Sequence, residues 1–118
     1  MDNFNQKLKT LIDLYIKDIY EITRLFPREE IFGVTSQLRR AALSVMLNYI
    51  EGFARRRGQK CKIYHNFLTI AFGSLKESKY LLYLASHLGY LSDSDYNKII
   101  ARGDEIGAML YKTIEINE

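Results

Sequence analysis

Basic side chains concentrate in one part of this 118-residue chain. Positions 39–62 hold seven arginines and lysines against one acid, whereas the remaining positions hold ten basic residues against thirteen acids. A local excess of positive charge can bind phosphates without reading a base sequence. The predicted nucleic-acid-binding residues are Arg39, Arg40, Arg55, Arg56, Arg57, Lys60 and Lys62. The alternative interpretation is a solvated helix end and loop, whose positive charge complements the dipole of the helix that ends there.

A polar pair, Asn48 and Glu51, lies within a largely apolar segment of the same region. At helical spacing it belongs to a polar stripe that also contains Arg40, Ser44 and Arg55. One interpretation is an exposed face with a Glu51–Arg55 ion pair. The other is a partly buried pair that bonds to another helix or another subunit, since a buried carboxylate needs a partner. Both interpretations assign the pair a structural role and leave catalysis unsupported.

Cys61 and His65, four positions apart, are at most half of a metal site, because the sequence offers no second pair of ligands. We therefore predict no metal and no cofactor. A ribonuclease of the helical HEPN type needs an arginine shortly before its histidine, but the seven residues between Arg57 and His65 are one too many. No glycine-rich phosphate loop, nucleophile elbow or paired-carboxylate motif is visible, so the sequence does not predict an enzyme.

Apolar residues recur at steps of three and four in four segments, which predicts four amphipathic helices. Pro27 ends the first, Thr35 or Ser36 caps the second, and Gly58 is its expected stop. Gly89 ends the third, and Ser92 with Asp95 resembles a capping box before the fourth. The expected core positions are Leu8, Ile12, Tyr15, Ile19, Ile22, Phe26, Leu38, Ala42, Val45, Tyr49, Phe53, Tyr64, Phe67, Leu68, Ala71, Leu75, Leu82, Ala85, Leu88, Tyr96, Ile99, Ile106, Leu110 and Ile114.

Short connections make successive helices antiparallel neighbours, so the predicted fold is all-α: a single domain over residues 1–118, built as an up-down-up-down four-helix bundle. Glycines inside the predicted helices indicate close helix approach, within or between subunits. The residues assigned to polar structure and packing are Asn48, Glu51, Gly52, Gly73, Ser74, Gly103 and Gly107. No apolar run is long enough to span a membrane, and "MDNFNQKLKT" does not look like a signal peptide. With one cysteine, the chain is expected to be cytoplasmic.

The segment "GVTSQLRRAALSVMLNYIEGFARR" resembles the four-helix-bundle family named after proteins encoded in 23S ribosomal-RNA intervening sequences. The likeness continues through "YHNFLTIAFGSLKES" and "LGYLSDSDY", and it covers the chain after about residue 15. The matching residues are Gly33, Thr35, Ser36, Gln37, Arg39, Arg40, Ala41, Ala42, Ser44, Asn48, Glu51, Gly52, Phe67, Leu68, Ile70, Ala71, Gly73, Ser74, Leu75 and Glu77. Met46 stands where the family has a proline, which predicts a straighter second helix here.

The same fold includes the accessory variability protein (Avd) of diversity-generating retroelements. The resemblance implies a basic pentamer that binds nucleic acid and a partner reverse transcriptase. The leading hypothesis is therefore a non-enzymatic homo-oligomer that binds nucleic acid as the accessory of such an enzyme. The alternatives are a protein-interaction scaffold without nucleic-acid binding and, more remotely, a HEPN-like ribonuclease.

Overall fold

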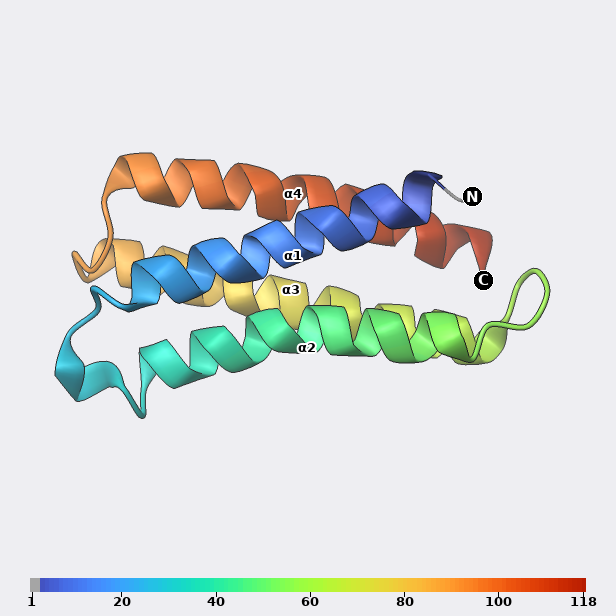
Figure 1. The fold of residues 1–118 in the computed structure, drawn as a ribbon, viewed down its shortest axis with the longest axis horizontal. Coiled ribbons are helices and arrows are strands. Elements are labelled where there is room, and N and C mark those ends of the chain that lie inside the picture. Colours follow the sequence, from blue (N-terminus) through green and yellow to red (C-terminus); the bar gives the residue numbers. More distant parts are fainter. Residues whose placement is uncertain (1–2) are drawn as a thin grey trace.

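The computed structural model describes residues 3–118, and within them it contains four α-helices, one 3-10 turn and no strand. Helix α1 spans Asn3–Thr23, α2 spans Val34–Ala54, α3 spans Lys62–His87 and α4 spans Asp93–Ile116, while the 3-10 turn η1 covers Arg28–Glu30. The helices run along the long axis of an elongated body of 46 × 25 × 20 Å (Figure 1). The prediction of an all-helical fold with four helices is confirmed.

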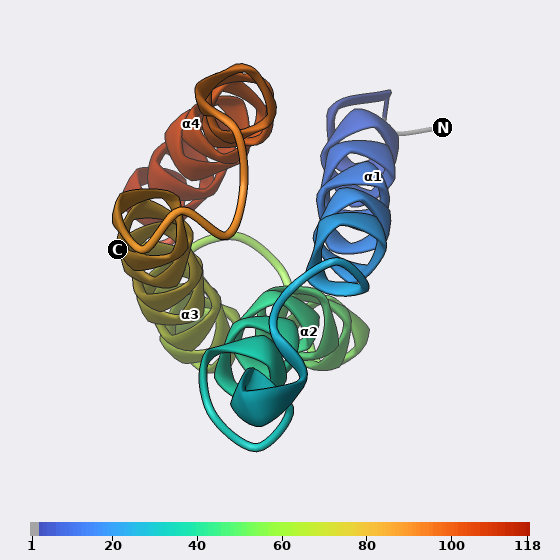
Figure 2. The same cartoon turned by 90° about the vertical axis from the view of Figure 1, so that its left-hand side faces the viewer.

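Each helix packs against its neighbours in the chain, and α4 closes the arrangement by packing against α1. The contact between α2 and α3 is the most extensive. Figure 2 shows the four helices around a common interior, and Figure 1 shows that successive connections lie at opposite ends of the molecule. The basic segment after α2 therefore lies at one end, and the connection between α1 and α2 lies at the other.

Most predicted core positions are buried, including the tyrosines Tyr15, Tyr49 and Tyr64. The prediction is wrong for two residues near helix ends: Phe53 is 37% exposed and Leu88 is 49% exposed. Phe53 lies in the last turn of α2 and Leu88 follows the last residue of α3, where the neighbouring helices give less cover. Ile22, Phe67, Tyr96 and Ile114 lie at the margin of the core and are only partly buried.

The start of α2 differs from the predicted one. Gly33 occupies the N-cap position, and the Ser36 hydroxyl donates a hydrogen bond back to the Gly33 carbonyl at 3.1 Å. The Glu30 carboxylate instead accepts from the Val34 N–H at 3.2 Å, so a side chain of η1 caps the helix. Its other oxygen accepts from the Tyr90 hydroxyl at 2.8 Å, which ties the α1–α2 connection to the α3–α4 connection.

The remaining ends follow the sequence signals more closely. Gly89 has the left-handed φ of 81°, and the N–H groups of Gly89 and Tyr90 bond back to the carbonyls of Ser86 and Ala85, which is a Schellman motif. The Ser92 hydroxyl accepts from the Asp95 N–H at 3.1 Å. Helix α2, however, ends at Ala54, four residues before the predicted stop at Gly58.

The glycines inside the helices fall into two groups in the structure. A Cβ at Gly52 would lie 2.6 Å from the Phe67 Cβ, so this glycine allows α2 and α3 to approach closely. A Cβ at Gly103 would lie 3.2 Å from the Tyr15 ring, and a Cβ at Gly107 would lie 3.3 Å from the Leu75 side chain. Packing within the chain therefore explains these two glycines as well. Gly73 has open space around it, so packing among the described residues does not explain it.

A buried hydrogen bond joins α1 to α3 inside the core. The Tyr15 hydroxyl lies 2.7 Å from the Ser78 Oγ. Burial raises the pKa of Tyr15 above its ordinary value, and the hydrogen bond to Ser78 offsets part of that rise.

Helix α2 runs without interruption through Met46. None of the helices in residues 3–118 combines the length and the apolar character needed to cross a bilayer.

Candidate nucleic-acid interface

The predicted basic segment forms the connection between α2 and α3, which extends past the ends of the neighbouring helices (Figure 1). Gly58 and Lys60 both have left-handed backbones, with φ of 60° and 52°, and these two residues turn the chain back toward α3. The Cys61 N–H donates to the Asn117 Oδ1 at 3.3 Å, which attaches the far side of the loop to the end of α4. We refer to residues 55–62, which comprise this connection and the first residue of α3, as the basic loop.

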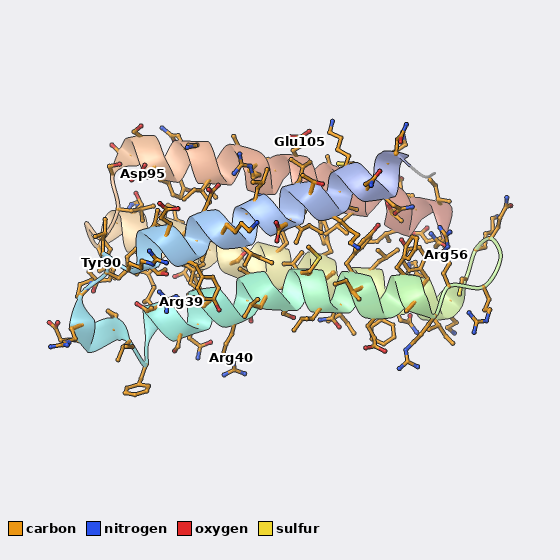
Figure 3. The ribbon with its side chains drawn as sticks, viewed as in Figure 1. Arg39, Arg40, Arg56, Tyr90, Asp95 and Glu105 are labelled. Carbon is orange, nitrogen blue, oxygen red and sulfur yellow. The ribbon has the colours of Figure 1, made fainter. Side chains whose placement is uncertain are left out.

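Arginines of the basic loop stack on aromatic side chains of α2 and α3. The Arg56 guanidinium lies 4.6 Å from the ring centre of Phe53 and 5.8 Å from that of Tyr64, and Arg55 lies 5.7 Å from that of Phe67. Phe53 meets Tyr64 edge-on at 6.1 Å. The guanidinium of Arg56 lies over an aromatic ring and carries the forked N–H donors that suit phosphate oxygens. Figure 3 shows Arg56 at this end of the molecule.

The charges of the basic loop differ in how far they are compensated. Arg55 donates to the Glu51 Oε2 through Nε at 2.7 Å and through Nη2 at 2.6 Å, an exposed pair of the kind worth about 0.3–0.5 kcal/mol. No ion pair with any residue in the range 3–118 forms at the other four basic positions, Arg56, Arg57, Lys60 and Lys62. The positive field of the loop therefore comes mainly from these four side chains.

In the polar stripe of α2, Glu51 is exposed and pairs with Arg55, whereas Asn48 bonds to Ser44 of its own helix. Asn48 donates to the Ser44 carbonyl at 2.9 Å and to the Ser44 Oγ at 3.0 Å. Ser44 in turn lies 2.7 Å from the Ser74 Oγ of α3. The stripe thus links α2 to α3 through hydroxyl groups, and Ser74 takes part in the contact between the two helices.

Cys61 and His65 lie at the start of α3. The backbone N–H of Tyr64, followed by that of Arg57, lowers the pKa of the Cys61 thiol. His65 shares a shallow groove with two basic residues, Lys60 and Lys62, and with Asn117 and the acid Glu118 at the end of the chain. Among the described residues, no group of three histidine, cysteine, aspartate or glutamate side chains could hold a metal ion.

Arg39 and Arg40 lie at the opposite end of α2, so the seven predicted residues form two separate groups. Arg39 donates through Nε to the Thr23 Oγ1 at 2.8 Å and lies 4.8 Å from the ring centre of Tyr20, so it bridges α2 to α1. Arg40 is exposed, and Figure 3 shows it directed away from the bundle. The sequence reasoning missed two further arginines at this end, Arg24 and Arg28, because they lie outside the 39–62 window.

The fold and the basic loop together define a small, basic, all-helical protein with four helices. The chain belongs to the 23S rRNA-intervening sequence protein family, whose family model matches residues 9–112. A protein of unknown function from the S23 ribosomal protein family of Bacteroides thetaiotaomicron has a similar crystal structure, with a TM-score of 0.80 and 22% identity. The similarity covers 92% of this chain and 98% of that one. No curated protein matches this chain.

Proposed function

We propose that the protein is a non-enzymatic homo-oligomer that binds nucleic acid through the basic loop. Four basic residues that pair with no acid in residues 3–118 lie on this loop, and one of them, Arg56, is stacked on Phe53 and Tyr64. Such a surface binds phosphates through charge and tolerates any base sequence. Phe53, which is 37% exposed, adds apolar surface beside this charge.

The oligomer in this proposal rests on a second apolar face of α2. Leu47 is 61% exposed and Ile50 is 45% exposed, and together with the partly buried Leu43 and the exposed Ala54 they recur at steps of four, three and four. Ile70 of α3, 52% exposed, is a further apolar side chain on the surface of the α2–α3 pair. An apolar stripe at this spacing is suited to packing against a helix of a second copy.

Two finer features of the proposal rest on different grounds. The short connections predict an antiparallel up-down-up-down bundle, and the family resemblance implies that the oligomer is a pentamer. The expected enzyme partner is a reverse transcriptase, with the protein serving as its accessory in the cytoplasm. The single cysteine, Cys61, agrees with a reducing compartment. A ring of subunits would place several basic loops on one surface, and this multiplies weak phosphate contacts into useful affinity.

Salt dependence of binding tests the nucleic-acid part. Purified protein is titrated with a labelled structured RNA and with a labelled DNA duplex over a series of salt concentrations. Replacing Arg56 and Arg57 with serine is expected to reduce the slope of log affinity against log salt by about 0.7–0.9 for each phosphate that the variant no longer binds. The matched control replaces Lys9 and Lys112, which are exposed basic residues outside the loop, with serine.

Three outcomes would contradict parts of the proposal. If neither nucleic acid binds at low salt, the basic loop has no phosphate-binding role and the scaffold hypothesis takes its place. If purified protein cleaves RNA and His65→Ala abolishes the cleavage, the non-enzymatic assignment is wrong and the HEPN-like hypothesis stands. If the slope of log affinity against log salt is the same for the loop variant and the lysine control, the basic loop is not part of the interface and the nucleic acid binds elsewhere on the protein.

A further inference from the structure

A second basic feature lies at the opposite end of the molecule from the basic loop. A groove of about 270 Å³ runs between the end of α1, the connection that follows it and the start of α2. Arg24, Arg28 and Arg39 line it, together with Thr23, Phe26, Pro27, Ile31 and Thr35. The groove is small by the standard of ligand sites, so it suits one compact group rather than a whole large ligand.

The orientation of Arg39 is fixed before any ligand arrives. The Thr23 hydroxyl donates to the Ile19 carbonyl at 2.7 Å and accepts from the Arg39 Nε at 2.8 Å. The Tyr20 ring packs against the same guanidinium at 4.8 Å. With Nε occupied, the four N–H donors on the two terminal nitrogens of Arg39 remain for the groove. Such pre-orientation reduces the entropy cost of binding an anion.

No acid within residues 3–118 forms an ion pair with any of the three arginines. Glu30, in the same connection, has its two oxygens engaged by the Val34 N–H and the Tyr90 hydroxyl. Glu21 lines a different groove between α1 and α4, and Glu29 is exposed. Three positive charges that share one groove repel each other, and a bound dianion relieves that repulsion.

We propose that this groove binds a phosphomonoester, such as the terminal phosphate of a nucleic-acid strand. A terminal phosphate carries close to two negative charges at neutral pH and ends the chain, so it can enter a short groove. The three arginines supply the forked donors that match phosphate oxygens. Phe26, Pro27 and Ile31 also line the groove and give it apolar surface for the attached sugar. The site is independent of the basic loop and contributes end preference to the proposed nucleic-acid binding.

Binding of matched oligonucleotides tests the inference. Three labelled single strands of one sequence carry a 5′-phosphate, a 3′-phosphate or no terminal phosphate, and their affinities are compared by fluorescence anisotropy. The wild-type protein is expected to prefer a phosphorylated strand by about tenfold or more, as charge-assisted hydrogen bonds imply. The double variant Arg24→Gln, Arg28→Gln should abolish that preference. The charge-matched control Lys9→Gln, Lys112→Gln changes two exposed lysines that do not line the groove, and it should retain the preference.

The experiment also separates the inference from the proposed function. Equal affinity for all three strands would overturn the strand-end assignment, and a preference that survives in the double variant would overturn the assignment to this groove. Inorganic phosphate and a nucleoside monophosphate are tested alone by thermal unfolding, since a ligand of the folded state raises the Tm. If they raise the Tm of wild type and of the lysine control but not of the double arginine variant, while no strand binds, the phosphate site stands and nucleic-acid binding fails.

Discussion

Replacement of Gly52 by alanine tests whether the close approach of α2 to α3 is required. The new Cβ would lie 2.6 Å from the Phe67 Cβ and 3.2 Å from the Tyr64 Cδ1. Because Phe67 meets it with its own Cβ, a rotamer change cannot remove the clash, and the two helices must move apart by about 1 Å. Overpacking of this kind costs about 1–3 kcal/mol, while alanine gains about 1 kcal/mol of helix propensity over glycine.

Gly73→Ala is the matched control because Gly73 is also inside a helix but has open space around it. The propensity gain is common to both variants, so the difference in their unfolding free energies isolates the contact with Phe67. We expect Gly73→Ala to stabilise the protein by about 0.5–1 kcal/mol and Gly52→Ala to be about 1–3 kcal/mol less stable than Gly73→Ala.

Urea unfolding followed by far-ultraviolet circular dichroism measures both variants against wild type, at one protomer concentration so that association contributes equally. The expected difference corresponds to a separation of the two Tm values by about 4–12 °C. If the two substitutions stabilise the protein equally, the close approach at Gly52 is not a constraint on the fold, and the reasoning fails.

Further predictions concern acid stability, assembly and the core. The hydrogen bond from Tyr90 lowers the pKa of Glu30 from 4.5. The stabilisation that this bond gives the folded state is therefore present above pH 4.5 and is lost as the pH falls through the lowered value. Urea unfolding at a series of pH values should show the stability deficit of Tyr90→Phe shrinking over that range. Leu47→Glu should dissociate the oligomer in light scattering while circular dichroism stays helical, and an unchanged mass would exclude that face. Ser78→Ala leaves the buried Tyr15 hydroxyl without its partner and should cost about 1–3 kcal/mol of unfolding free energy. Tyr15→Phe should cost less, because Ser78 in that variant still donates to the Leu75 carbonyl. Chemical unfolding of the two variants makes the comparison.

The sequence was sufficient for the four helices because their information is local and periodic. Gly89 and Ser92 act within one turn of the helix that each punctuates, and both signals predicted the observed geometry. The cap of α2 was missed because Glu30 reaches it from a separate 3-10 turn, a tertiary arrangement that no spacing rule describes. Phe53 was assigned to the core because its spacing is correct, but periodicity does not show where a neighbouring helix ends.

The candidate sites were less predictable than the fold because charge clusters depend on how distant segments meet. The sequence identified Arg56 as part of a basic run, but its stacking on Tyr64 requires α2 and α3 to lie side by side. Arg24 and Arg39 are fifteen positions apart, and they line one groove only because the connection after α1 turns back along α2. A sequence window that joins them, residues 24–39, also takes in Glu29 and Glu30, which reduce its net charge to +1.

The distance between the two basic features limits how they act together. The basic loop and the groove lined by Arg24, Arg28 and Arg39 lie at opposite ends of a molecule 46 Å long. A B-form duplex rises 3.4 Å per base pair, so about 14 base pairs span the full length of one subunit. For shorter duplexes, the effects of Arg56→Ser and of Arg24→Gln, Arg28→Gln on affinity should add within about 0.5 kcal/mol. Marked non-additivity on a short duplex would mean that the loop of one subunit lies beside the groove of another, because no single subunit brings them together.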